Sequence, residues 1–223
     1  MPPRIGLVHA VAVAVEPINN AFAALWPGAV VSNLLDDSLS SDLAAAGEQN
    51  LAIQDRILRL GNYARDSGAD AILYTCSAFG LAIDLAKLKL QVPALKPDDA
   101  MIDQALDISR DSGGGTVGVL ATFQPTLSGT QQQFTERAAE RGIPLHIVLR
   151  HVPGAMDALR QGDHERHDKL IATAACAMKD CACIVLAQFS MARARQEVEM
   201  AQPVPVQTSP EAAVSRLRQL LGA

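Results

Sequence analysis

Three short apolar segments in the first half of the chain recur in the second half at one constant separation. The pairs are Ile5–Val8 with Val117–Leu120, Ala71–Tyr74 with Cys183–Leu186, and Val92–Ala94 with Val204–Val206. Each segment is short enough to match by chance, but the shared separation indicates an internal duplication. The alternative is a single doubly wound sheet in which the spacing is a coincidence.

Short apolar runs alternate with longer helical patterns along the whole chain. We expect strands at Ile5–His9, Ala29–Asn33, Ala71–Tyr74, Val92–Leu95, Val117–Ala121, Leu145–Leu149, Cys183–Ala187 and Val204–Val206. We expect helices at Ser41–Ser67, Ala78–Lys89, Asp98–Arg110, Leu127–Arg141, His164–Met178 and Glu211–Leu221. This alternation is typical of an α/β protein, in which helices cover both faces of a parallel sheet.

The duplication therefore predicts two similar αβα lobes with parallel four-stranded sheets, related by a pseudo-twofold axis. We expect the first lobe to comprise residues 1–96 plus 207–223, so that the last strand and helix return to it. The second lobe then comprises residues 97–206. Because ligands of open parallel sheets bind at the carboxyl ends of the strands, we expect the loops at those ends to line one shared cleft.

Composition narrows the classes of partner. The net charge is −5, aromatic residues make up 4% of the chain, and there is no basic cluster. These features argue against nucleic acid or an anionic membrane as the main partner, whereas a small carboxylate stays possible. No apolar run reaches the roughly 18–20 residues of a membrane-spanning helix. The four cysteines include no CxxC pair, so we expect free thiols and a cytoplasmic location.

The sequence gives no convincing site for a metal or an organic cofactor. His164 and His167 have a helical spacing, but the dense alternating charge around them is typical of a solvated helix start. The glycines at 113–115 precede a strand, whereas a phosphate-binding loop follows one. We assign Cys176, Cys181 and Cys183 to packing, and we expect neither a metal nor a cofactor.

Cys76 is the strongest candidate for a catalytic residue. It lies in the segment Thr75-Cys76-Ser77, between the end of a predicted strand and the start of a predicted helix. The partial positive charge of a helix N-terminus lowers the pKa of a thiol, and the free N–H groups there bind anions. Thr75 and Ser77 add hydroxyl donors for a carboxylate. A buried structural cysteine is the alternative interpretation.

Further polar residues follow the ends of the other predicted strands. His9 ends the first strand, where it is either a proton donor or acceptor near pH 7 or a hydrogen-bonded strand-end histidine. Asp36 and Asp37 follow the second strand and are candidates for binding a substrate ammonium or hydroxyl, or are loop or helix-capping acids. In the second half, the candidates for substrate binding are Thr122, Thr126, Gln188 and Ser190. Gln188 is the counterpart of Cys76 in the repeat, and its amide cannot act as a base.

Together these features resemble the aspartate/glutamate racemase superfamily, which includes hydantoin racemases, maleate isomerase and arylmalonate decarboxylase. The resemblance rests on the two similar halves, the Thr75-Cys76-Ser77 turn, the run Val117–Thr122 and the segment Leu186–Met191. Cys76 matches the family's first catalytic cysteine, and Gln188 stands where many members have the second. The resemblance implies two αβα lobes, proton transfer without a cofactor, and a homodimer or larger homo-oligomer.

The missing second cysteine leaves three functions open. The first is a racemase or isomerase in which Cys76 transfers a proton at the α-carbon of a small carboxylate or amino-acid derivative, with His9 as its partner. The second is a one-cysteine decarboxylase or lyase that resembles arylmalonate decarboxylase, in which the cysteine lies in the other half. The third is a protein that binds a small carboxylate without turning it over.

Overall fold

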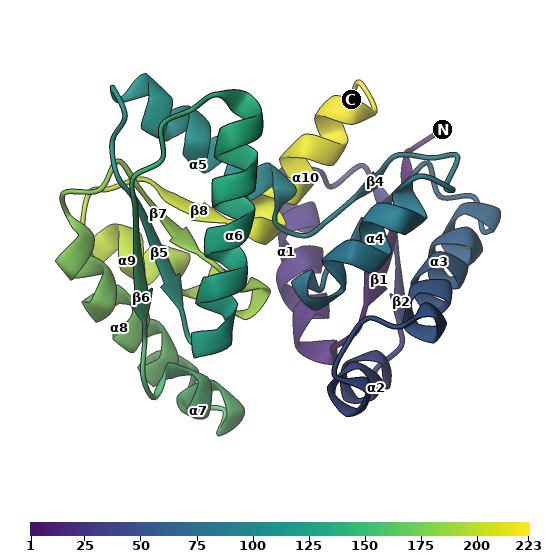
Figure 1. Cartoon of the computed structure of the whole chain (residues 1–223), viewed down its shortest axis with the longest axis horizontal. Coiled ribbons are helices and arrows are strands. Elements are labelled where there is room, and N and C mark those ends of the chain that lie inside the picture. The colour runs from purple at the N-terminus through teal and green to yellow at the C-terminus, as the bar shows by residue number, and fades with distance from the viewer. The chain divides into compact units, whose positions relative to one another are not determined.

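The computed structural model describes residues 1–223, apart from the side chain of Pro125. The chain divides into two compact units. Unit 1 comprises Met1–Asp99 and Ala213–Ala223, and unit 2 comprises Ala100–Ala212. Each unit contains one four-stranded parallel sheet with helices packed against it (Figure 1). The prediction of an α/β fold with two parallel four-stranded sheets is therefore confirmed.

The sheet of unit 1 has the strand order β2-β1-β3-β4. Its strands are β1 (Arg4–His9), β2 (Val30–Leu35), β3 (Ala71–Tyr74) and β4 (Ala94–Leu95). β1 lies in the interior between β2 and β3, and Ile5 pairs with Val31 on one side and Ala71 on the other. Every residue of β3 is buried, as expected for an interior parallel strand whose two faces are both covered.

The helices of unit 1 cover both faces of this sheet. They are α1 (Val15–Leu25), α2 (Leu39–Ala46), α3 (Leu51–Asp66) and α4 (Gly80–Lys87), together with the part of α10 (Ser209–Leu220) from Ala213 onward. Residues of α2, α3 and α4 form one core with Val8, Ile72 and Tyr74 of the sheet. This core lies directly beneath the end of β3, where Cys76 follows.

The sheet of unit 2 repeats this strand order as β6-β5-β7-β8. Its strands are β5 (Val117–Ala121), β6 (Ile147–His151), β7 (Cys183–Leu186) and β8 (Val206–Thr208). Its helices are α5 (Asp99–Asp111), α6 (Gln124–Arg141), α7 (Ala155–Arg160), α8 (His164–Ala175) and α9 (Arg195–Ala201). α5 and α6 form a core on one face of the sheet, and α8 and α9 form a core on the other.

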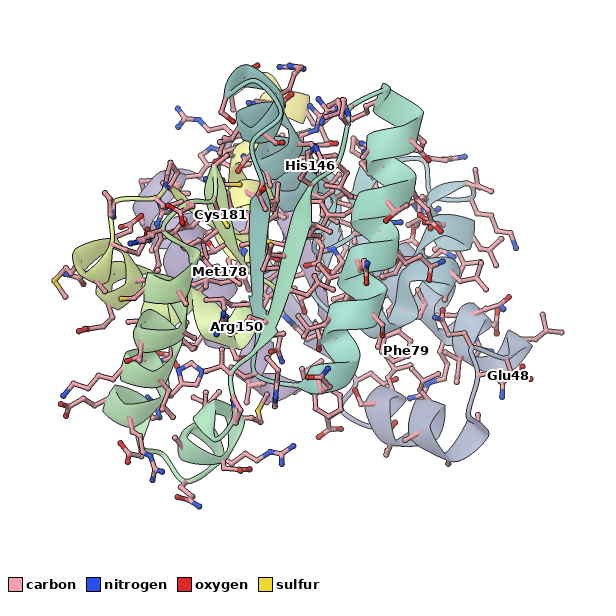
Figure 2. All side chains as sticks on the ribbon, turned by 60° about the vertical axis from the view of Figure 1, so that its left-hand side comes forward. Glu48, Phe79, His146, Arg150, Met178 and Cys181 are labelled. Carbon is pink, nitrogen blue, oxygen red and sulfur yellow. The ribbon has the colours of Figure 1, made fainter. Side chains whose placement is uncertain are left out.

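A glycine at the same place in both sheets shows why the two halves share a sequence pattern. A Cβ added to Gly6 on β1 would lie 2.7 Å from the Cβ of Ala64 on α3. A Cβ added to Gly118 on β5 would lie 2.9 Å from Sδ of Met178 and 3.1 Å from Sγ of Cys181, which lie beside this strand (Figure 2). Both positions therefore need glycine because another segment approaches the central strand closely.

The structure corrects three expectations about the elements. The last strand does not return to the first unit, because β8 pairs with β7 in the second sheet. The helix expected over Ser41–Ser67 is two helices, since Gly47 takes the left-handed conformation at φ 71° and the Asn50 side chain caps α3 by accepting from Ile53 N–H. Finally, α1, α7 and α9 were not predicted, because their short apolar patterns are interrupted by polar residues or proline.

Candidate active site

The Thr75-Cys76-Ser77 turn follows directly from the buried strand β3. Thr75 N–H donates to the carbonyl of Val8 at 3.0 Å, which extends the pairing between β1 and β3 by one residue. Cys76 is extended, at φ −124° and ψ 114°, and precedes a short 3-10 helix at Ser77–Phe79 that leads into α4. The thiol is half-buried, whereas Ser77 is exposed. The carboxyl end of β3 therefore presents a partly accessible thiol.

Gln49, from the loop before α3, holds this turn in place. Its amide donates to the carbonyl of Ala78 at 2.9 Å, and its side-chain oxygen accepts from Ala82 N–H at 2.9 Å. Two backbone positions after Cys76 are thus fixed by one side chain. The sequence carries no signal for this role, because Gln49 lies in an irregular segment that the whole of α3 and β3 separates from the cysteine.

The environment of Cys76 differs from the expectation of a lowered pKa. Burial raises the pKa of the thiol, and the carboxylate of Asp98 raises it further, while a hydrogen bond from Ala78 N–H opposes both. A single N–H group at a short 3-10 helix does not compensate for the loss of solvation. At neutral pH the Cys76 side chain is therefore a protonated thiol, which can donate a proton but must lose it before it can act as a base.

His9 is fully buried beside this turn, and both of its ring nitrogens have partners. Nδ1 lies 2.8 Å from Oγ1 of Thr75, and Nε2 lies 2.9 Å from Oδ1 of Asn33. The Thr75 hydroxyl also lies 3.3 Å from the Val8 carbonyl. Burial lowers the pKa of His9, although the hydrogen bond to Asn33 opposes this shift, so the ring is neutral at neutral pH. These contacts tie β1, β2 and β3 together near their carboxyl ends.

A small cavity of about 10 Å³ lies between His9 and Cys76, and its other lining residues are mainly apolar. This volume is close to the minimum for one water molecule. Tyr74 and Phe79 contribute aromatic side chains to its wall, and both are almost completely buried. The space beside the thiol is therefore closely packed and mainly apolar, in agreement with the desolvation that raises the Cys76 pKa.

Asp36, the candidate for binding an ammonium, is engaged in an ion pair. Arg56 on α3 contacts Asp36 at 2.5 Å and also contacts Asp42. Burial alone would raise the Asp36 pKa, but the hydrogen bonds from Arg56 and Ser38 lower it below its ordinary value. These contacts make Asp36 a structural acid of the loop before α2, and it does not cap the helix, because no side chain forms a capping hydrogen bond at the N-cap of α2.

In unit 2 the equivalent strand ends carry a different set of groups. Gln188 follows β7 as Cys76 follows β3, and its side-chain oxygen accepts from both Thr122 N–H at 2.7 Å and the Thr122 hydroxyl at 2.9 Å. Since the backbone N–H can only donate, the acceptor must be the amide oxygen. The Gln188 NH₂ group is then left as a hydrogen-bond donor.

The other candidates in unit 2 lie near this pair in the chain. Thr126 is half-buried in the first turn of α6, and Ser190 is half-buried in the 3-10 helix Phe189–Ala194. His151, at the end of β6, places Nε2 3.3 Å from the carbonyl of Thr122. Sequence reasoning missed His151 because the apolar pattern of that strand ends at Leu149. It missed Asn33 because a polar residue at the predicted end of a strand gives no sign of its partner.

The structure was also searched for clusters of metal-binding side chains and for helices that could span a membrane. Among the residues whose positions are described, no group of three or more histidine, cysteine, aspartate or glutamate side chains is placed to hold a metal ion. In the same part of the chain, no helix has both the length and the apolar character needed to cross a bilayer.

The family model for Asp/Glu/hydantoin racemases matches residues 8–217. The chain belongs to this family. None of the curated protein sequences matches it significantly. Among solved structures, it is similar to an allantoin racemase from Klebsiella pneumoniae, with 19% identity, a TM-score of 0.74, and coverage of 99% of this chain and 88% of that one.

Two further structures show the same fold. An aspartate racemase from Picrophilus torridus is 18% identical, with a TM-score of 0.68 and coverage of 99% of this chain and 94% of that one. A Gly74Cys mutant of arylmalonate decarboxylase is also 18% identical, with a TM-score of 0.64 and the same two coverages. At these identities the likeness concerns the fold, which is shared by racemases and a decarboxylase.

Proposed function

We propose that this protein is an isomerase of the racemase type, in which Cys76 transfers a proton at the α-carbon of a small carboxylate or amino-acid derivative. The observation that carries the proposal is the half-buried thiol at the carboxyl end of β3, held by the turn that Gln49 and Thr75 fix. Membership of the racemase family supports the class of reaction. The proposal assigns no role to a metal or an organic cofactor.

Because the pKa of Cys76 is raised, the thiol must first release its proton to solvent, and the thiolate so formed then removes the α-proton. The C–H electron pair then moves into an enediolate, and the sulfur carries the proton as a thiol. Hydrogen-bond donors stabilise the charge on the enediolate oxygens, and within unit 1 we assign this role to the exposed hydroxyl of Ser77. Return of the proton from the Cys76 thiol restores the original acid. Delivery of a proton from solvent to the other face inverts the carbon, and the Cys76 thiol then loses its proton to solvent.

Thr75, Thr122 and His9 fit supporting roles better than direct contact with substrate. The Thr122 hydroxyl already donates to Gln188, so it orients that amide within unit 2. Thr75 and His9 bond to each other, and both ring nitrogens of His9 are engaged. We therefore propose that His9 positions the Thr75-Cys76 turn. To act as the second base, it would have to release Thr75 or Asn33 first.

A second candidate function, decarboxylation, is favoured by one specific observation. The position equivalent to Cys76 holds an amide that cannot remove or return a proton, and the raised pKa of Cys76 keeps its proton in place. In this reaction the bond to a departing carboxylate breaks, carbon dioxide leaves, and its electron pair forms the enediolate. The Cys76 thiol then donates its proton to the carbon, and solvent reprotonates the thiolate.

The experiment that tests the proposal is a panel of small carboxylates and amino-acid derivatives in heavy water, followed by NMR and mass spectrometry. Deuterium at the α-carbon without carbon dioxide release supports isomerase chemistry, and carbon dioxide release supports decarboxylation. Cys76→Ala should abolish either activity, whereas Cys176→Ala, which removes an exposed thiol elsewhere, should not. Turnover that persists in Cys76→Ala would contradict both functions.

A further inference from the structure

The loop that follows β1 lies beside Cys76 in unit 1. Val8 on β1 pairs with Tyr74 on β3, and Thr75 N–H donates to the Val8 carbonyl at 3.0 Å. Continuing this register along both strands brings Ala10 level with Cys76 in the neighbouring strand. Ala10 and Cys76 accordingly line the same small cavity. The loop therefore begins at the height of the thiol, on its β1 side.

Every side chain of this loop is small and apolar. The segment Ala10–Ala14, which we term the β1 loop, alternates alanine and valine, although connecting segments ordinarily contain polar residues. Val11 is extended, at φ −147° and ψ 136°, and a 3-10 turn at Ala12–Ala14 then leads into α1. Val13 is 64% exposed. The β1 loop thus continues past the level of Cys76 and carries an exposed apolar side chain there.

Two positively charged side chains near the strand ends of unit 1 are each held by two acids. Arg56 pairs with Asp36, which follows β2, and with a second aspartate on α2. Lys96, which follows β4, pairs with acids on α4 and at the start of α5 at 3.1 Å and 3.6 Å. The carboxylate of Asp98 lies close enough to Cys76 to raise its pKa. A further carboxylate in unit 1 would be repelled by Asp98 and would have to displace an acid from Arg56 or Lys96.

We propose that the substrate carries an uncharged, apolar side group, which unit 1 holds against the β1 loop while Cys76 acts at the α-carbon. The inference rests on the proposed function and names its substrate class: carboxylates with an alkyl or aryl side group, and not acids with a further carboxylate on that group. Contact with alanine and valine side chains removes apolar surface from water, which is favourable. A side-group carboxylate in the same place would lose its hydration without gaining a partner.

The test measures protection of Cys76 from alkylation by iodoacetamide, which requires binding of a ligand but no turnover. Isocaproate and succinate are matched probes, because an isopropyl group in the first takes the place of one carboxylate in the second. We expect isocaproate to slow alkylation with an apparent dissociation constant at least about tenfold lower than that of succinate. Peptide mapping follows each thiol separately, and the exposed Cys176 is the internal control, since neither compound should protect it.

A substitution makes the test specific to the β1 loop. Val13→Lys should raise the affinity for succinate and lower that for isocaproate, because the lysine supplies a cation and interrupts the apolar surface. The matched control is Val30→Lys, since Val30 is 44% exposed but begins β2, at the amino end of the same sheet. This control should leave both affinities unchanged. Circular dichroism establishes that each variant is folded.

The outcomes separate this inference from the proposed function. Equal or better protection by succinate in the wild-type protein would overturn the inference and leave the proposed function standing. Protection by neither compound would overturn both, because no small carboxylate would then bind beside the thiol. An unchanged preference in Val13→Lys, or the same change in Val30→Lys, would show that the β1 loop does not hold the side group.

Discussion

Replacing His9 separates a positioning role from a role in proton transfer. His9→Leu removes both hydrogen bonds of the ring, those to Thr75 at 2.8 Å and to Asn33 at 2.9 Å. His9→Asn keeps a short polar group that can still reach Thr75. If His9 only positions the turn, the asparagine variant should retain most of the activity that the leucine variant loses.

The magnitude follows from the burial of the two partners. Thr75 is 4% exposed, so its lost hydrogen bond is not replaced by water and costs about 1 kcal/mol in the free energy of unfolding. Asn33 is exposed, so water replaces its bond at a smaller cost. We expect His9→Leu to lose about 1–2 kcal/mol in urea unfolding. Movement of the Cys76 turn should lower kcat by up to about 10²-fold.

The pH dependence of stability provides a check within the same variants. The folded-state pKa of His9 is lowered from its ordinary value of 6.5, because burial disfavours the charged ring. The folded state therefore binds fewer protons than the unfolded state, and stability is lost as the pH falls below 6.5 and through the folded pKa. His9→Leu should show a smaller loss in that range. Two folded variants with equally abolished activity would refute the positioning role and show that the imidazole itself carries the proton.

Three further predictions concern the thiol, the amide and the packing of the sheets. The pKa of Cys76 is raised above 9.0, so kcat/KM for isomerisation, which needs the thiolate, should rise with pH through the alkaline range. Decarboxylation, which needs the protonated thiol, should instead decline there. A pH profile of kcat/KM distinguishes the two reactions. Gln188→Leu should leave the buried N–H and hydroxyl of Thr122 without their acceptor and cost about 1–3 kcal/mol in urea unfolding, whereas Gln188→Glu, which keeps an acceptor oxygen, should cost less; equal midpoints for the two variants would contradict this. Gly6→Ala should destabilise the protein by about 1–3 kcal/mol in urea unfolding, because the Cβ of Ala64 lies 2.7 Å from the new methyl group and belongs to the rigid stem of α3. Gly118→Ala should cost less, since its nearest contact is a flexible methionine side chain, and an unchanged midpoint for Gly6→Ala would show that α3 is not packed as described.

The fold could be predicted to a large extent from local pattern. The bounds of β3 and β5 agree with the predicted Ala71–Tyr74 and Val117–Ala121, because interior parallel strands are buried on both faces and read as continuous apolar runs. Edge strands were placed less well. β2 has no buried residue and continues beyond Asn33 to Leu35, because an edge strand can carry exposed polar residues such as Ser32 and Asn33 and so resembles a loop.

The candidate site shows what local pattern cannot supply. The sequence identified Cys76 and Gln188 and their equivalence, since each follows the matching strand of its own half of the repeat. It did not identify Gln49, which fixes the turn after Cys76, or Asn33, which holds His9. Nothing in the residues around a glutamine or an asparagine in an irregular or edge segment indicates which distant backbone group or side chain it will meet.

The sequence by itself determined the class of fold, the duplicated strand order and the position of the thiol, because each depends on short-range periodicity and on spacing along the chain. Only the tertiary structure decided the state of that thiol. The helix start after Cys76 suggested a lowered pKa, but burial beside His9, Leu39 and Ile57, and the nearby carboxylate of Asp98, raise it. Solvation of a buried group depends on everything packed around it, and those neighbours come from parts of the chain that are far apart in sequence.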